Sequence, residues 1–118
     1  MALTPGGDIG SGAIGGARRP PPKGDKALEY RYLGASGLQV SPICLGTMMF
    51  GRRTSAVVSA RIIGSARDAG INFIDVADVY ANGESERIIA KCLRRDRDNW
   101  VLATKIGYPT GKRPMEGG

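Results

Sequence analysis

The feature of this sequence that most constrains its fold is the alternation of short apolar runs with amphipathic helical segments. Mostly apolar runs of strand length occupy residues 43–50, 71–77 and 100–106. Such a run is typical of a strand that is buried on both faces, as the strands of parallel sheets are. Strands that alternate with helices favour a parallel sheet joined by right-handed crossovers. The sequence therefore predicts an α/β fold with a parallel sheet.

A helix is expected between each pair of neighbouring runs. The first is predicted by apolar residues that recur every three or four positions, namely Val58, Ile62, Ala66 and Ala69. Thr54 and Ser55 are candidate N-caps of this helix, and Gly70 is a candidate C-cap. The second helix is expected to begin within residues 82–86, where acidic residues suit the helix dipole. Its predicted buried stripe consists of Ile88, Ile89, Cys92 and Leu93.

Ordered structure is expected to begin near Glu29. The preceding residues 1–28 are rich in Gly, Pro and Ser, and the consecutive prolines at 20–22 fit neither a helix nor a central strand. We interpret residues 1–28 as a disordered leader and residues 29–118 as one folded unit. That unit is expected to open with a β-hairpin around the turn at 34–37 and to continue in the order β-α-β-α-β.

Residues 10–15 satisfy the dinucleotide-binding pattern G-x-G-x-x-G. The pattern binds a cofactor where a strand leads into the first glycine and a helix follows the third. No strand-like run precedes Gly10, and Pro20 would break any helix that follows. We interpret this match as a chance occurrence in a glycine-rich segment.

The charge pattern narrows the possible partners. The net charge is +6, but the cations are scattered, and Asp96 and Asp98 alternate with the cluster Arg94, Arg95 and Arg97. Nucleic-acid binding requires cations gathered on one face, so a basic surface without a nucleic-acid partner is expected. No apolar stretch reaches the ~20 residues that span a membrane, and the N-terminus lacks the pattern of a secretory signal. These features predict a cytoplasmic protein with no membrane partner.

The sequence offers no metal site. There is no histidine, and Cys44 and Cys92 lie far apart, outside any ligand spacing such as CxxC. Each lies in an apolar run, so both are expected to be buried free thiols. The absence of histidine also removes the commonest general base.

Three polar residues stand at or just after the ends of predicted strands. Asp75 interrupts the second run, Tyr80 lies in the following loop, and Lys105 closes the third run. In parallel β/α folds the carboxyl ends of the strands form the active-site face. An ammonium lowers the pKa of a phenol from its reference of about 10, and a carboxylate keeps that ammonium charged, so the three groups could protonate a carbonyl oxygen. Taken separately, the acid could cap a turn, the tyrosine could pack on the surface, and the lysine could solubilise a strand end.

Several short motifs follow one another along the chain: YRYLGASGLQVS at 30–41, LGTM at 45–48, FG at 50–51, DAGINFID at 68–75, ADVY at 77–80, GESE at 83–86 and LATK at 102–105. In this order they resemble the N-terminal part of the aldo-keto reductase family, from Glu29 to Gly107. The resemblance implies a partial TIM (β/α)₈ barrel that uses NADPH to reduce an aldehyde or ketone.

The resemblance also implies a role for each site residue. Tyr80 would be the general acid, Lys105 would lower its pKa, and Asp75 would support Lys105. The residues expected at the nicotinamide end of the cofactor pocket are Gly46, Thr47, Met48 and Asp75. Val76 stands where the family most often has Thr or Ser.

The largest departure from the family is what the chain lacks. A (β/α)₈ barrel takes about 250 residues, whereas this sequence contains only its first strands. The family's catalytic histidine has no counterpart, because the chain has no histidine. The chain is therefore expected to be a truncated part of a barrel with little or no activity alone. The alternative is a non-catalytic binding or regulatory module that reuses the reductase fold, since the family includes barrel subunits of potassium channels.

Overall fold

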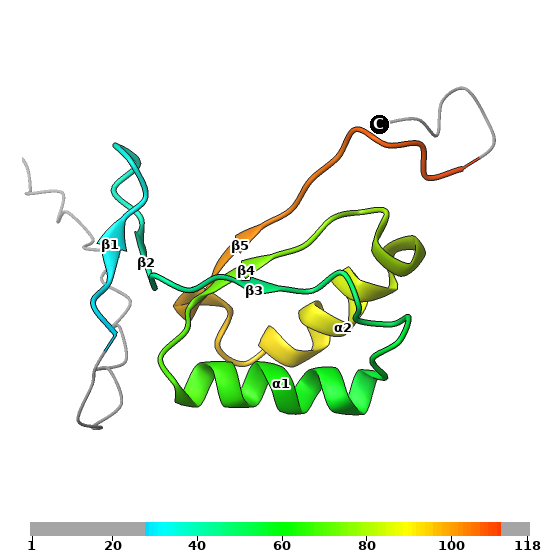
Figure 1. The fold of residues 1–118 in the computed structure, drawn as a ribbon, viewed down its shortest axis with the longest axis horizontal. Helices are drawn as coiled ribbons and strands as arrows, with labels where there is room; N and C mark the ends of the chain where they lie inside the picture. The colour runs from blue at the N-terminus through cyan, green and yellow to red at the C-terminus, as the bar shows by residue number, and fades with distance from the viewer. Residues whose placement is uncertain (1–27, 112–118) are drawn as a thin grey trace, which may run out of the picture.

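The computed structural model describes residues 28–111. Almost the whole of the leader at 1–28, the glycine motif at 10–15 and the last residues of the predicted folded unit lie outside the described part. Within it, the chain forms a two-stranded sheet, a three-stranded sheet and two α-helices (Figure 1).

The two-stranded sheet is the hairpin expected around the turn at 34–37. Strands β1 (Arg31–Tyr32) and β2 (Gln39–Val40) pair antiparallel. The hairpin stands at the amino-terminal end of the other sheet (Figure 1). Asn72 joins the two parts, because its side chain accepts a hydrogen bond from the Ser41 amide at 2.7 Å and donates one to the Gln39 carbonyl at 3.0 Å.

The three-stranded sheet is parallel, in the order β3-β4-β5. Its strands are β3 (Leu45–Gly46), β4 (Phe73–Asp75) and β5 (Val101–Ala103). All three are shorter than the apolar runs that predicted them. The first run, for example, leaves the sheet after Gly46 and enters a turn in which the Phe50 amide donates to the Thr47 carbonyl at 3.0 Å.

Helix α1 (Ala56–Asp68) begins and ends at residues that the sequence indicates. Ser55 is the N-cap, and its hydroxyl accepts a hydrogen bond from the Val58 amide at 3.4 Å. Gly70 follows the last turn in the left-handed conformation, with φ +82°. The amides of Gly70 and Ile71 then donate back to the carbonyls of the final turn, which is the Schellman arrangement that glycine favours.

The predicted apolar stripe of α1 is confirmed as buried at Ala66 and is wrong at Val58, Ile62 and Ala69. The buried residues are Ser59, Ile63 and Ala66. Val58 and Ile62 are 39% and 36% exposed, and Ala69 is exposed. Because Ile62 and Ile63 are adjacent, a helical face centred on either residue fits the apolar spacing. Packing against the sheet and α2 buries the face that contains Ile63. Ser59 tolerates burial because its hydroxyl donates to the carbonyl of the N-cap residue at 2.9 Å.

Helix α2 (Glu84–Leu93) has the buried stripe that the sequence predicts. Ile88, Ile89 and Leu93 are buried, and Cys92 packs against them. Both helices cover the same face of the parallel sheet (Figure 1). Neither helix described in residues 28–111 is long and apolar enough to cross a membrane.

The prediction of two buried thiols is wrong for Cys44. Cys92 is half-buried, but Cys44 is exposed. Side chains alternate between the two faces of a strand, so when Leu45 turns toward the core the preceding Cys44 turns away from it.

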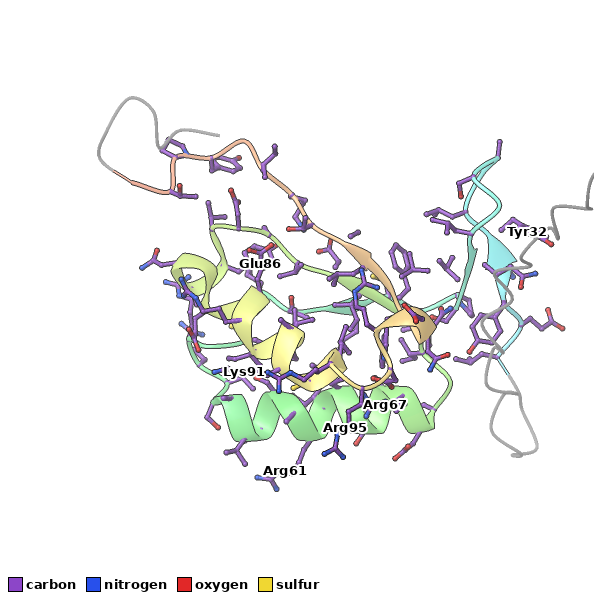
Figure 2. All side chains as sticks on the ribbon, turned by 180° about the vertical axis from the view of Figure 1, so that it is seen from behind. Tyr32, Arg61, Arg67, Glu86, Lys91 and Arg95 are labelled. Carbon is purple, nitrogen blue, oxygen red and sulfur yellow. The ribbon has the colours of Figure 1, made fainter. Side chains whose placement is uncertain are left out.

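An ionic cluster fixes the loop after α2 onto α1. Arg67 donates two hydrogen bonds to the Asp96 carboxylate, at 2.6 and 3.1 Å, and its guanidinium lies 5.7 Å from the ring centroid of Trp100. The Trp100 indole nitrogen donates to the same carboxylate at 3.3 Å. In Figure 2 Arg67 points toward this loop, whereas Arg61 points away from the body of the protein. The cluster thus attaches the segment just before β5 to α1.

Replacing Ile63 by Ala is expected to lower the free energy of unfolding by about 2–5 kcal/mol, because it removes a fully buried side chain from the core. The matched variant Ile62→Ala is expected to cost less than about 1 kcal/mol, since it trims a partly exposed side chain. Urea unfolding followed by circular dichroism measures both. Equal losses at the two positions would contradict the observed orientation of α1.

Candidate active site

The three polar residues singled out in the sequence lie together at the carboxyl end of the parallel sheet. Asp75 is the last residue of β4, and Lys105 is the second residue after the end of β5. Tyr80 is the first residue of a 3₁₀ turn, η1 (Tyr80–Gly83), that leads into α2. The strands end on the same side of Figure 1, which is also where η1 lies.

The strongest contact in this cluster is the ion pair between Lys105 and Asp75. The Lys105 ammonium lies 2.7 and 2.8 Å from the two carboxylate oxygens. It donates a further hydrogen bond to the Val76 carbonyl at 2.8 Å. Three acceptors therefore surround an amine that has three protons to donate. The pair is half open to solvent, with side-chain exposures of 48% for the lysine and 41% for the aspartate.

Tyr80 completes the cluster through its ring and hydroxyl. The Lys105 ammonium lies 5.0 Å from the centroid of the Tyr80 ring, within the range of a cation–π contact. The hydrogen bond to Asp75 is the main cause that raises the pKa of Lys105 above its ordinary value of 10.5. Desolvation opposes this rise in the pKa, and the Tyr80 hydroxyl and the negative charge of Asp75 reinforce it. The amine is therefore charged at neutral pH.

Backbone hydrogen bonds hold the two segments of the cluster together beyond the strands. The Val76 amide donates to the Ala103 carbonyl at 2.8 Å, and the Asp78 amide donates to the Lys105 carbonyl at 3.2 Å. The loop that leads to Tyr80 thus stays attached to the segment that carries Lys105. The Tyr80 amide closes the turn by donating to the Ala77 carbonyl at 3.2 Å.

A chain of buried hydroxyls lies next to Asp75. The Thr47 hydroxyl donates to the Asp75 carbonyl at 2.8 Å. The Ser85 hydroxyl donates to the Thr47 carbonyl at 3.0 Å and lies 3.3 Å from the Thr47 hydroxyl. Thr47 and Ser85 are both buried. The chain joins the loop after β3, the end of β4 and the first turn of α2.

Of the residues expected to line the cofactor pocket, Gly46 and Met48 are exposed and Thr47 is buried. Met48 is 54% exposed, and Gly46 is exposed with nothing within 4 Å of where a side chain would begin. The side chain of Thr47 instead points into the protein, where its hydroxyl is occupied by Asp75 and Ser85. Sequence reasoning missed Ser85, although it lies in the GESE motif at 83–86.

The surface at β3 and just after it is open to solvent. Gly46 lies on the strand beside Asp75, and Met48 lies in the turn that follows; both are exposed. In the part of the chain that the structure describes, no group of three or more His, Cys, Asp or Glu residues is placed to hold a metal. The polar groups that the structure brings together nearby are a carboxylate, an ammonium and a phenol.

The fold and this cluster define a parallel β/α protein with an ion pair and a phenol at the carboxyl end of its sheet. Comparison with known proteins gives the family. The sequence profile of the Aldo/keto reductase family matches residues 42–117. The chain belongs to the aldo/keto reductase family.

Individual relatives agree with this assignment. The uncharacterized oxidoreductase YrpG of Bacillus subtilis is 44% identical over 89 residues, which cover 70% of this chain and 27% of the relative. A protein of Oryza sativa named "Probable voltage-gated potassium channel subunit beta" is 36% identical, covering 77% of this chain and 29% of its own length. An aldo-keto reductase of Bacillus halodurans, solved in its holo form, has a TM-score of 0.66 and 36% identity over 76% of this chain and 29% of its own. The chain thus spans less than a third of each relative.

Replacing Thr47 by Val is expected to lower the free energy of unfolding by about 1–3 kcal/mol, because the Asp75 carbonyl loses the Thr47 hydroxyl as its donor. The Ser85 hydroxyl keeps its hydrogen bond to the Thr47 carbonyl. Thr47→Ser keeps the hydroxyl and removes one methyl group, so it is expected to cost only about 0.8 kcal/mol. Urea unfolding of the two variants tests the hydroxyl chain. A serine variant less stable than the valine variant would show that packing, rather than hydrogen bonding, matters at this position.

Replacing Asp75 by Asn is expected to lower the pKa of Lys105 toward 10.5, because the main cause of its rise is removed. The NMR titration of the Lys105 Cε resonance measures this shift. A raised lysine pKa stabilises the folded protein at pH values below the ordinary pKa of lysine. This contribution is lost as the pH rises through the pKa of Lys105 in the folded protein. The control Asp78→Asn should leave Lys105 unchanged, since the Asp78 carboxylate accepts from the Val79 amide. An unaltered titration in Asp75→Asn would refute the assignment.

Proposed function

We propose that this chain is the opening part of a TIM (β/α)₈ barrel that uses NADPH to reduce an aldehyde or ketone, with Tyr80 as the general acid. The observation that carries the proposal is the placement of the Lys105 ammonium between the Asp75 carboxylate and the Tyr80 ring. The family assignment supports it, because the relatives include oxidoreductases.

The proposed chemistry assigns one task to each side chain. NADPH supplies the hydride when it is bound. The Tyr80 hydroxyl donates its proton to the carbonyl oxygen as negative charge develops there. The Lys105 ammonium stabilises the phenolate that remains, because a positive charge within a few ångströms favours the anion. Asp75 binds the ammonium through both oxygens and so keeps it charged and directed.

The nicotinamide is proposed to lie against the exposed surface at β3. Gly46 leaves room for a ring to approach the backbone, and Met48 offers an apolar side chain beside it. Thr47 would act through its backbone and through its hydrogen bond to the Asp75 carbonyl. Because the chain spans 27–29% of the lengths of YrpG and of the solved reductase, we expect NADPH affinity and turnover to require the later strands of the barrel as well.

A second candidate is a non-catalytic binding or regulatory module. The 36% identity to the protein named as a potassium channel subunit beta favours it. This function would keep the fold and the cofactor-facing surface but would not need proton transfer. NADPH binding without turnover of any aldehyde, in a polypeptide extended past Gly118, would support the module over the reductase.

Replacing Tyr80 by Phe is expected to reduce kcat about 10²–10⁴-fold, the usual contribution of a general acid, while NADPH affinity is retained. The measurement is oxidation of NADPH by a simple aldehyde, using the product of a reading frame that continues past Gly118. Tyr108→Phe removes the hydroxyl of an exposed tyrosine elsewhere and should leave turnover unchanged. Equal activity in the two variants would exclude Tyr80 as the proton donor.

A further inference from the structure

A pair of adjacent arginines lies on the loop between β3 and α1. Arg52 and Arg53 are both exposed. Together with Met49 they line a pocket of about 510 Å³. Two guanidinium groups can bind an organic anion, because the planar guanidinium matches the oxygens of phosphate and carboxylate. The apolar side chain of Met49 can contact the rest of such a ligand.

Neither guanidinium has a hydrogen bond or ion pair with any residue in the described range 28–111. Among the other arginines of this range, three are engaged: Arg67 with Asp96, Arg87 with Glu84, and Arg97 with the Trp100 carbonyl. Two neighbouring cations repel each other, so an anion between them would relieve that repulsion as well as form hydrogen bonds.

The loop that carries the pair is held firmly. Phe50 is buried in the core with 3% exposure and forms a β-bridge with Thr54. The Gly51 amide donates to the Thr54 carbonyl at 2.9 Å, and the amides of Arg52 and Thr54 both donate to the Met49 carbonyl, at 3.1 and 3.0 Å. Binding at this loop would therefore cost little ordering of the backbone.

The same loop touches the turn that carries the proposed general acid. A Cβ placed on Gly51 would lie 3.3 Å from the Cβ of Ala81 and 3.0 Å from Cγ of Glu84. Ala81 follows Tyr80 directly in η1. Glu84 would weaken the attraction for an anion, but its carboxylate pairs with Arg87 at 3.4 Å. Gly51 thus places the loop that carries the arginine pair against η1, the turn that begins with Tyr80.

We propose that Arg52 and Arg53 bind an anionic group, a phosphate or a carboxylate, of the ligand that occupies this end of the sheet. Identifying that ligand as a carbonyl substrate or its cofactor rests on the proposed function; the anion site itself does not. If the anion belongs to the substrate, the pair selects carbonyl compounds that carry a carboxylate or phosphate. If it belongs to the cofactor, the pair adds to the binding of NADPH.

The test is an NMR titration of the 118-residue chain with inorganic phosphate at low ionic strength. We expect the amide resonances of residues 49–54 to shift, with an affinity that falls as salt is added. The double variant Arg52→Gln, Arg53→Gln should weaken binding at least tenfold. The control Arg94→Gln, Arg95→Gln removes the same charge from two exposed arginines of another segment and should leave the affinity unchanged.

A conservative variant separates directed binding from bulk charge. Arg52→Lys, Arg53→Lys keeps the charge but loses the planar fork, and it should also weaken binding. No shift in residues 49–54, or an equal loss of affinity in the Arg94, Arg95 control, would overturn the proposal. An unchanged amide spectrum outside the loop shows that each variant is folded.

Further titrations, of a polypeptide extended past Gly118 that can bind NADPH, identify the source of the anion. Shifts in residues 49–54 with 4-carboxybenzaldehyde but not with benzaldehyde assign the site to the substrate. Shifts with NADPH that are lost in the Gln variant assign it to the cofactor. Phosphate binding should be unaffected by Tyr80→Phe. Failure of the reductase proposal would leave the phosphate titration intact, and failure of the anion site would leave the loss of turnover in Tyr80→Phe intact.

Discussion

The pairing of β4 with a strand on each side is the constraint on which the described structure depends. Ile74 stands opposite Leu45 and Leu102, and this row faces the helices, with Ile74 fully buried. The next row, of opposite orientation, consists of Gly46, Asp75 and Ala103. Because Asp75 is flanked by the two smallest kinds of side chain, its carboxylate stays open. Lys105, two residues after Ala103, returns to the same face and can reach it. The same strand register therefore places the core residues on one face of the sheet and the ion pair on the other.

Stability and the proposed function are divided between two layers at this end of the sheet. The Lys105–Asp75 pair is half exposed, and such pairs add little to the free energy of folding. The hydroxyls of Thr47 and Ser85 are buried, so their hydrogen bonds are costly to lose. The buried chain fixes the Asp75 backbone, and the exposed carboxylate then holds the ammonium. A substitution of the buried hydroxyls is therefore expected to disturb the ion pair, whereas a substitution in the ion pair is expected to leave the fold largely intact.

Local chemistry predicted much of the fold, and tertiary packing decided the rest. The ends of α1 follow from Ser55 and Gly70, which act through their own backbone and side chain. The buried face of α1 was not predictable, because Ile62 and Ile63 fit the helical period equally well. The turn η1 was also missed, since Ala81 and Asn82 adopt positive φ without a glycine. For the site, strand-end position identified the three polar residues. Their contacts, and the inward direction of Thr47, required the strand register that no local pattern contains. The roles of these residues stay predictions.

The exposure of the cluster has a consequence for the proposed reaction. Water around Lys105 screens its charge, so its effect on the neighbouring phenol is weaker than the same geometry would produce in a dry site. Any group that covers the pair, whether a bound ligand or neighbouring protein, excludes water and strengthens the attraction. The geometry is already set by β4, β5 and η1, so covering it requires no rearrangement of those elements. How strongly Lys105 stabilises the phenolate in the proposed reaction therefore depends on what covers Asp75, Tyr80 and Lys105.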